Sequence, residues 1–112
     1  MSAQLFNLLA QLPLAGEREN FHTLFESASV RIERIVSDGQ SSPADFWYNQ
    51  DYDEWVFLMQ GEAVLEFATG EQHTLRAGDS LCIAAHCRHR VASTASRSVW
   101  LAVHILGDAR LT

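Results

Sequence analysis

Four side chains that could bind a ligand lie in two strand-like stretches of the sequence. Tyr48 and Gln50 belong to the first stretch, Glu54 follows a short turn at 51–53, and His89 belongs to the second. Alternate residues of a strand share a face, so Tyr48 and Gln50 point the same way, and the turn brings Glu54 onto a neighbouring strand. A carboxylate and an imidazole held together serve as metal ligands, as an acid–base pair or as a structural hydrogen-bonded pair. These alternatives stay open for Glu54 and His89.

Three further polar residues are candidates for the same pocket. Arg34 interrupts an apolar alternation. Facing inward it would need Glu54 or Asp53 as a partner, because an unpaired buried charge is very costly, and facing outward it would be an ordinary surface arginine. His86 precedes the second stretch near the expected mouth of the pocket, as a solvated loop residue or as a substrate contact. His104 alternates with apolar residues on the last strand-like stretch, and the sequence does not fix which face of that strand is inside.

The two cysteines carry no chemistry in our interpretation. Cys82 and Cys87 are five residues apart in or beside a strand-like stretch. A disulfide between them is not expected in a reducing cytoplasm. A zinc site made with His86 and His89 is not expected either, because the four residues lack a usual zinc spacing and point in diverging directions along extended chain. We expect one buried and one partly exposed thiol.

The length of the chain predicts one small domain, and its charge predicts that this domain has no basic face. The chain has 112 residues, 47% of them hydrophobic, and a formal net charge of −6, which argues against binding nucleic acid or an anionic membrane. No apolar run reaches the roughly 18 residues that a membrane span needs. No basic residues precede an apolar stretch at the start, so a secretory signal is not expected and the expected compartment is the cytoplasm. All eight basic residues are arginines, which excludes a lysine Schiff base.

Two short helices are expected before the strands begin. The apolar residues of the first segment recur at the spacing of one helix face: Leu5, Leu8, Leu9 and Leu12. Pro13 would end this helix, and a second helical turn is expected over 17–25. Both segments would cover the outside of a larger structure.

From Val30 onward, short extended runs are separated by turns rich in glycine, serine and aspartate. The runs predict eight strands, at 30–37, 46–50, 54–60, 63–67, 72–75, 80–83, 89–93 and 98–105. A parallel sheet would need helical crossovers, for which the chain has no room. The pattern therefore predicts an all-β antiparallel sandwich or jelly roll.

Two residue patterns resemble the motifs of the cupin family. The first motif has two histidines one residue apart, then a glutamate and a glycine, and its frame is occupied here by Tyr48, Gln50, Glu54 and Gly61. The second has a glycine, a glycine-aspartate turn, an isoleucine and a histidine, matched by Gly70, Gly78, Asp79, Ile83 and His89. The resemblance implies a cupin-type double-stranded β-helix, a jelly-roll barrel over about residues 30–106. With the helical segment expected from apolar spacing over about residues 1–26, the chain is expected to form a single domain, 1–112.

The resemblance also implies a metal site at Gln50, Glu54 and His89. The site departs from the family's pattern, because Tyr48 and Gln50 replace the two histidines of the first motif. Zinc, nickel and iron favour nitrogen donors, so we expect one divalent ion (zinc, nickel, iron or manganese) to be bound weakly. Tyr48 is expected as a wall of the pocket, and Gln50 has the alternative role of a hydrogen-bonding residue that lines the barrel.

The expected function is therefore binding of, or action on, a small molecule inside the barrel. As an enzyme, the chain would use Glu54 and His89 as metal ligands or as an acid–base pair. The alternative is a non-catalytic binding or sensing module with a metal-free pocket. Apolar residues of one outer sheet face, such as Trp55 and Phe57, predict a two-fold homodimer, because a large exposed apolar patch is normally an interface.

Overall fold

The computed structural model describes residues 3–13, 16 and 18–107. Within these ranges the secondary structure is all β, in eight antiparallel strands. The strands are β1 (Asn20–Glu26), β2 (Val30–Ser37), β3 (Asp53–Gln60), β4 (Glu62–Phe67), β5 (Gln72–Arg76), β6 (Ser80–Ile83), β7 (His89–Thr94) and β8 (Ser98–Ile105). None of the described segments is a helix that could cross a membrane.

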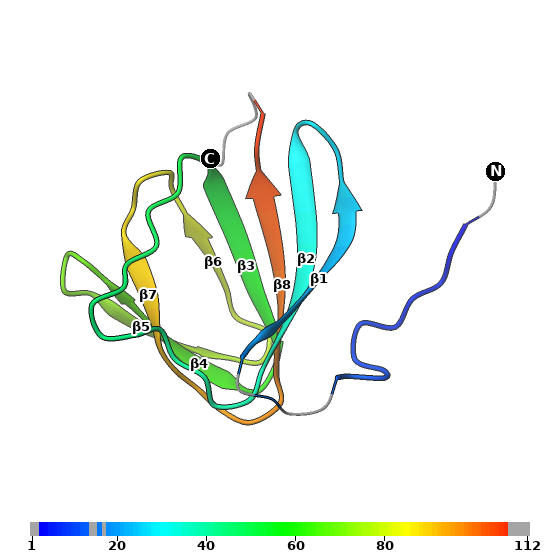
Figure 1. Ribbon diagram of the computed structural model, residues 1–112, viewed down its shortest axis with the longest axis horizontal. Coiled ribbons are helices and arrows are strands. Elements are labelled where there is room, and N and C mark those ends of the chain that lie inside the picture. The colour runs from blue at the N-terminus through cyan, green and yellow to red at the C-terminus, as the bar shows by residue number, and fades with distance from the viewer. Residues whose placement is uncertain (1–2, 14–15, 17, 108–112) are drawn as a thin grey trace.

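The strands form two sheets that face each other (Figure 1). The larger sheet has the order β1-β2-β8-β3-β6, and the smaller has the order β5-β4-β7. The chain passes repeatedly from one sheet to the other, as in a jelly roll. The β3–β4 and β7–β8 connections cross between the sheets at one end of the molecule (Figure 1). The expected jelly-roll barrel is confirmed.

Alternation along the strands places the core between the sheets. On β3 every second residue from Glu54 to Leu58 is buried, and on β4 the buried positions again alternate. The apolar side chains that meet between the sheets are Val56, Leu58, Ala63, Leu65, Phe67, Leu75, Ile83, Trp100 and Ala102. Polar residues of the same inner face, such as Glu54 and His104, therefore point into the barrel rather than into solvent.

The two expected N-terminal helices are wrong. Residues 3–13 contain turns and bends but no helix, and their apolar side chains stay largely in solvent, with Leu5 fully exposed. The second segment is strand β1, which pairs with β2 (Asn20 opposite Val36, for example), while its residue 17 lies outside the described residues. Unpaired backbone groups at the edge of β2 outweigh a weak helical spacing, because a strand partner satisfies a whole row of them.

Seven of the expected strands occur, and one does not. The run 46–50 forms only an isolated bridge, between Tyr48 and His89, instead of a strand. The bridge has two backbone hydrogen bonds, from Tyr48 N to His89 O at 2.7 Å and from His89 N to Tyr48 O at 3.2 Å. This short contact is enough to fix both residues beside each other at the edge of the smaller sheet.

Candidate functional site

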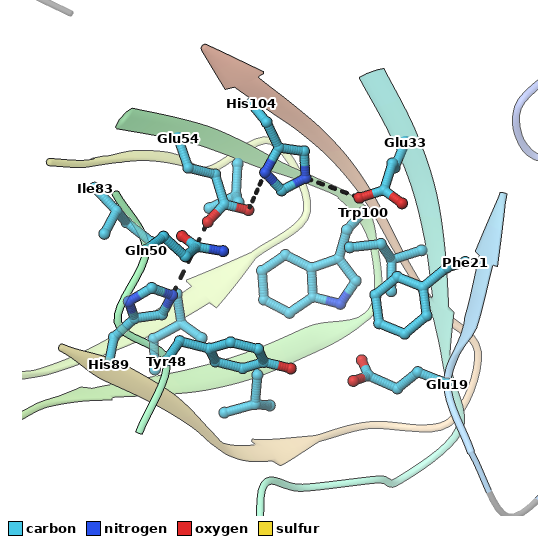
Figure 2. Close-up of a pocket in the computed structure, with 14 residues that line it drawn as sticks. Glu19, Phe21, Glu33, Tyr48, Gln50, Glu54, Ile83, His89, Trp100 and His104 are labelled. Atoms are coloured by element: carbon cyan, nitrogen blue, oxygen red, sulfur yellow. Dashed lines mark hydrogen bonds and ion pairs between the residues drawn. The ribbon is translucent and has the colours of Figure 1, made fainter. Parts of the chain in front are cut away.

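A cavity of about 100 Å³ lies between the two sheets (Figure 2). Its polar lining consists of Glu19, Glu33, Tyr48, Gln50, Glu54, His89, Trp100 and His104. Its apolar lining consists of Phe21, Ile35, Val56, Leu65, Ile83 and Val91. An apolar cavity with a few converging polar groups is the usual form of a small-molecule site.

The Glu54 carboxyl group lies between two histidines from different strands. One carboxyl oxygen is 4.0 Å from His89 Nε2, and the other is 3.9 Å from His104 Nδ1 (Figure 2). The register explains the second contact, because Glu54 on β3 is directly opposite His104 on β8. His89 reaches the same carboxyl group from β7 in the other sheet. The three side chains are each less than a tenth exposed.

Hydrogen bonds on the far side of each ring turn a lone pair toward Glu54. His89 Nδ1 is 2.9 Å from the carbonyl oxygen of Cys87, which only accepts, so Nδ1 carries the proton and Nε2 the lone pair. His104 Nε2 donates to the Glu33 carboxylate at 2.8 Å, which leaves the lone pair on Nδ1. Both imidazoles therefore present an acceptor to Glu54.

Burial shifts the pKa values of these groups toward their neutral forms. Desolvation, and secondarily repulsion from Glu33, raises the pKa of Glu54 to about 7, against opposing effects from Arg31 and a hydrogen bond from Gln50. Burial also lowers the pKa of His89 and that of His104. Both histidines are therefore neutral near pH 7. Their contacts with Glu54 have the distances of ion pairs, but they join the carboxyl group to the lone pairs of uncharged imidazole rings.

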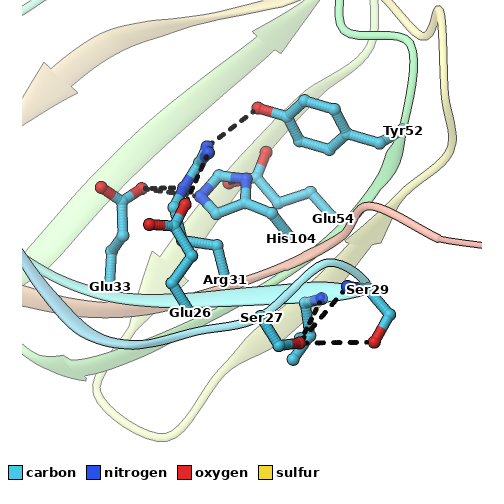
Figure 3. A network of polar contacts seen from close by, with 9 residues as sticks. Glu26, Ser27, Ser29, Arg31, Glu33, Tyr52, Glu54 and His104 are labelled. Atoms are coloured by element: carbon cyan, nitrogen blue, oxygen red, sulfur yellow. Dashed lines mark hydrogen bonds and ion pairs between the residues drawn. The ribbon is translucent and has the colours of Figure 1, made fainter.

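A network at one end of the barrel holds His104 in place (Figure 3). Arg31 Nε is 3.6 Å from Glu33, another guanidinium nitrogen is 4.0 Å from Glu26, and a third contact of 3.4 Å reaches the Tyr52 hydroxyl. The Tyr52 ring also packs edge-on against His104, with 5.3 Å between ring centroids. The network fixes Glu33, and Glu33 fixes the tautomer and orientation of the His104 ring.

Tyr48 forms a wall beside His89. Their rings stack at 5.4 Å between centroids, with 25° between planes. Figure 2 shows the Tyr48 hydroxyl directed toward Glu19 and away from Glu54. Burial, with repulsion from Glu19 and Glu54, raises the pKa of Tyr48, so the phenol stays protonated.

The cavity contains five of the seven residues that the sequence predicted for the site. Gln50, Glu54 and His89, predicted as metal ligands, all line it, and so do Tyr48 and His104 from the predicted pocket set. Arg34 and His86 do not line it. The geometry brings the first five together without testing the role of any of them.

The placement of Arg34 inside the pocket is wrong. Its neighbours Glu33 and Ile35 line the cavity, so Arg34 points to the opposite face of β2. There its guanidinium group donates to the Leu8 carbonyl oxygen at 3.3 Å and lies 5.4 Å from the centre of the Phe6 ring. Arg34 is buried by the N-terminal segment rather than paired with a carboxylate of the site.

The placement of His86 in the pocket is also wrong. His86 lies in the loop before β7, where its backbone nitrogen donates to the Gln50 carbonyl oxygen at 2.7 Å. Its ring Nδ1 is 3.1 Å from the side-chain oxygen of Asn49. Both contacts hold the 49–50 segment, so His86 supports the position of Gln50 from outside the cavity.

The sequence interpretation missed three polar lining residues, namely Glu19, Glu33 and Trp100. Glu33 and Trp100 carried a partial signal, because each stands in an alternating strand pattern with one face to be buried. The missing information was which face is inside, and only the pairing of β2 with β8 supplies it. Glu19 precedes β1, in a segment that was expected to be helical, and no pattern in the sequence pointed to it.

The cupin domain family matches residues 33–104 of the chain. No curated protein matches it. Among solved structures, a candidate mannose-6-phosphate isomerase from Ralstonia eutropha JMP134 shares 42% identity over 94% of this chain and 100% of that chain, with a TM-score of 0.89. Two more distant structures share the fold. A cupin superfamily protein from Desulfitobacterium hafniense DCB-2 has 21% identity over 95% of this chain and 94% of that chain, with a TM-score of 0.79. KdgF from Halomonas sp. has 14% identity over 94% of this chain and 95% of that chain, with a TM-score of 0.75.

Proposed function

Because the chain belongs to the cupin family, we propose that its barrel cavity binds a small molecule and transfers a proton on it, with Glu54 as the acid–base group. The observation that carries the proposal is the Glu54 carboxyl group, buried in the cavity between the lone pairs of His89 and His104. A general acid–base group works best when its pKa is near the operating pH, and the pKa of Glu54 is raised to about 7.

The proposed reaction is an isomerisation that moves hydrogen between neighbouring carbons of a carbonyl compound. Ionised Glu54 takes the proton from the carbon beside the carbonyl group. The electron pair of that C–H bond forms the carbon–carbon double bond of an enediolate, and the π electron pair of the carbonyl group moves onto its oxygen. Glu54 then returns its proton to the former carbonyl carbon. One imidazole lone pair relays the hydroxyl proton from one substrate oxygen to the other, so every enzyme group ends the cycle unchanged.

The relative from Ralstonia eutropha supports this class of reaction. That protein is described as a candidate mannose-6-phosphate isomerase, and it is 42% identical to this chain over almost all of both chains. Isomerisation of an aldose to a ketose is a proton transfer of the proposed kind. The fold alone would not support the proposal, because one fold hosts many functions.

Cupins commonly bind divalent metals, but the donors of this cavity do not fit a resident metal ion. Among the described residues, no group of three or more histidine, cysteine, aspartate or glutamate side chains could hold a metal. Glu54 and His89 of the predicted set are strong donors, and His104 is a third. The two histidines face different oxygens of the Glu54 carboxyl group, at 4.0 and 3.9 Å, and Gln50 donates a hydrogen bond to Glu54 instead of presenting a fourth donor. The Tyr48 phenol stays protonated and points away from Glu54. The proposed steps therefore involve only the residues of the chain.

Solvent hydrogen exchange tests the proposal. The protein would be incubated in D₂O with matched aldoses and ketoses, and deuterium entering the carbon beside the carbonyl group would be followed by NMR. We expect exchange with the wild type, and a loss of about a hundredfold or more in Glu54→Gln, since general acid–base catalysis contributes roughly 10²–10⁴ in rate. Glu71→Gln is the control, because this exposed glutamate does not line the cavity.

Two outcomes would contradict the proposal. Exchange that survives in Glu54→Gln would remove Glu54 from the reaction. Binding of a sugar without any exchange would instead favour the non-catalytic binding module.

A further inference from the structure

The structure points to an uncharged, hydroxyl-rich molecule as the ligand of the cavity, and to exclusion of its phosphate ester. This inference deepens the proposed function and rests on the same site. It concerns which molecule binds, whereas the proposed function concerns what Glu54 does to it. The two are therefore separable by experiment.

Among the residues that the structure describes, the lining of the cavity carries acidic groups and no basic side chain that is free to pair with an anion. Three carboxyl groups, those of Glu19, Glu33 and Glu54, face the cavity, and no arginine lines it. The chain contains no lysine. The two lining histidines hold their ring N–H on the far side, toward Cys87 O and Glu33, and present an acceptor nitrogen instead of a donor to Glu54. A phosphate ester would bring up to two negative charges into a site that offers acidic groups and no cation to pair with.

Arg31 is the cation beside the site, and the carboxylates of Glu26 and Glu33 already pair with its charge, while its buried Nε makes no hydrogen bond within the described residues. Arg31 forms ion pairs with Glu26 and Glu33 and a hydrogen-bond contact with the Tyr52 hydroxyl (Figure 3). Releasing Arg31 to bind a phosphate would free Glu33, which would then carry an unpaired charge at the cavity and lose its hold on the His104 ring. The network therefore opposes recruitment of Arg31 by an anion.

The lining also contains buried hydrogen-bonding groups that have no partner among the described residues. Trp100 is 4% exposed, and its Nε1–H donor has no hydrogen-bond partner among the described residues. The His104 Nδ1 acceptor is likewise without a hydrogen-bond partner among them, and carboxyl oxygens of Glu19 and Glu54 add further acceptors. A buried polar atom without a partner is costly, so the ligand should supply one. The ligand must accept from Trp100 and donate to several acceptors.

A hydroxyl group meets both demands, because it donates one hydrogen bond and accepts others. An ammonium group donates but cannot accept from Trp100, and a phosphate accepts but has too few protons for the acceptors. Two of the remaining walls, Phe21 and Tyr48, are aromatic and suit the C–H faces of a small polyol or monosaccharide, and the other apolar walls are aliphatic. An uncharged hydroxylated molecule satisfies both the charge and the hydrogen bonds, whereas its phosphate ester and its amine each fail one of them.

Pairs of ligands that differ only by one phosphate or amino group test the inference. Calorimetry and Trp fluorescence would compare neutral compounds with their phosphate esters: glycerol with glycerol 3-phosphate, and D-mannose with D-mannose 6-phosphate. D-Mannosamine adds a cation on the same ring. We expect a neutral compound to bind at least about tenfold more tightly than its ester and than the amine, a factor that corresponds to about 1.4 kcal/mol.

Two variants, each of which removes one carboxylate, test whether the preference for neutral compounds over esters comes from the cavity. Glu19→Gln should narrow the preference for the neutral compound over its ester by roughly threefold or more, by removing one carboxylate from the lining. Glu71→Gln makes the same charge change outside the cavity and should leave the preference unchanged. Thermal unfolding of both variants would confirm that they are folded.

The inference is overturned if no neutral compound binds at millimolar concentration, if an ester or the amine binds more tightly than its neutral partner, or if both variants change the preference equally. Exchange in D₂O separates this failure from failure of the proposed function. An ester that binds best and also exchanges through Glu54 would leave the proposed function standing. A neutral sugar that binds best without exchange would leave the ligand class standing.

Discussion

The pKa of Glu54 is raised because few neighbouring groups stabilise its ionised form. Glu33 lies on the β2 side and repels it, and the imidazoles of His89 and His104 are neutral near pH 7. Only Arg31 and the amide of Gln50 favour ionised Glu54. One buried carboxyl group among neutral acceptors is thus the residue-level basis of the proposed chemistry.

Glu54 predicts a distinctive pH dependence of stability. Its pKa is raised in the folded protein from 4.5 to about 7, so the folded state binds the proton more tightly than the unfolded state. The resulting stability is full below pH 4.5 and is lost as the pH rises through 7, by about 3 kcal/mol in total. Glu54→Gln cannot ionise, so the variant should gain stability relative to the wild type across this window.

Urea unfolding of both proteins near pH 4.5 and pH 8 measures this difference. The lowered pKa values of His89 and His104 act in the opposite direction, since their stability contribution is lost as the pH falls below 6.5. The histidines are present in both proteins, so the comparison removes most of their effect. A difference that does not change with pH would contradict the raised pKa of Glu54.

The residue at position 50 should set the affinity of the cavity for a divalent metal. Gln50 stands beside Glu54 and His89 at a position where the resemblance to cupin motifs implies histidine. Gln50→His would add an imidazole to one carboxylate and one imidazole, and first-row metals favour nitrogen donors. We expect zinc or nickel affinity to rise by about tenfold, or about 1.4 kcal/mol, in calorimetry. Equal or weaker binding by the variant would show that the cavity is not a degraded metal site.

Single-residue chemistry was only partly predictable from the sequence. Glu54 and His89 stood out because polar residues are unusual inside strand patterns, and both line the cavity. Arg34 and Glu33 were misjudged, because adjacent polar residues of one strand must face opposite ways and neither composition nor spacing says which one is inside. The pairing of β2 with β8 settles this, and it is a contact between distant parts of the chain.

At the scale of elements, the strands were predictable and the N-terminal segment was not. Turn residues delimit β2 to β8 closely, and β2 and β8 have the predicted bounds. The leucines of the first segment have helical spacing, but a short helix gains stability mainly by packing an apolar face. Leu5 and Leu9 remain exposed, so that gain is absent here. The strand β1 forms because β2 offers it a partner, which a local pattern does not reveal.

The turn between β3 and β4 is the tightest point of the barrel. Gly61 has a φ of +93°, and a Cβ added there would lie 2.3 Å from Ser98 Oγ and 2.7 Å from Ser98 Cα. Ser98 is fully buried and bonds the carbonyl oxygens of Glu62 and Ala95, so it has little room to move. The close approach ties this turn to the start of β8, which carries Trp100 and His104 into the cavity.

Gly61→Ala should therefore destabilise the protein more than Gly70→Ala. Both glycines have a left-handed φ, which costs an alanine roughly 1–2 kcal/mol, but a Cβ at Gly70 meets nothing within 4 Å. The clash with Ser98 should add about 1–3 kcal/mol, as overpacking commonly does. Chemical unfolding of the two variants measures the difference, and equal losses would mean that the turn does not depend on close packing.

At the scale of the whole molecule, the outer face of the larger sheet has an apolar centre. Trp55 and Phe57 on β3 stack at 5.8 Å between ring centroids and are only partly buried. Their partners across the ladder are Val103 and Leu101 on β8, which are also partly buried. Apolar side chains that adjoin on one face suit an interface, and a two-fold symmetric dimer is the commonest assembly.

We therefore propose a homodimer joined through this outer face. Light scattering after gel filtration should give twice the chain mass at tens of micromolar protein. Trp55→Glu should produce monomers by placing a charge in the interface, whereas Phe46→Glu, an exposed aromatic in the loop before β3, should not. A wild-type monomer, or equal effects of the two variants, would contradict an interface at this face.

The proposed chemistry requires a carboxyl group in the cavity that exchanges a proton at neutral pH. NMR titration of glutamate side chains labelled with carbon-13 at the carboxyl position measures this directly, and Glu54→Gln identifies the resonance of Glu54. We expect one carboxyl resonance that titrates with a midpoint of about 7 in the wild type and is missing from the variant. A Glu54 resonance that titrates near the ordinary glutamate value of 4.5 would contradict it.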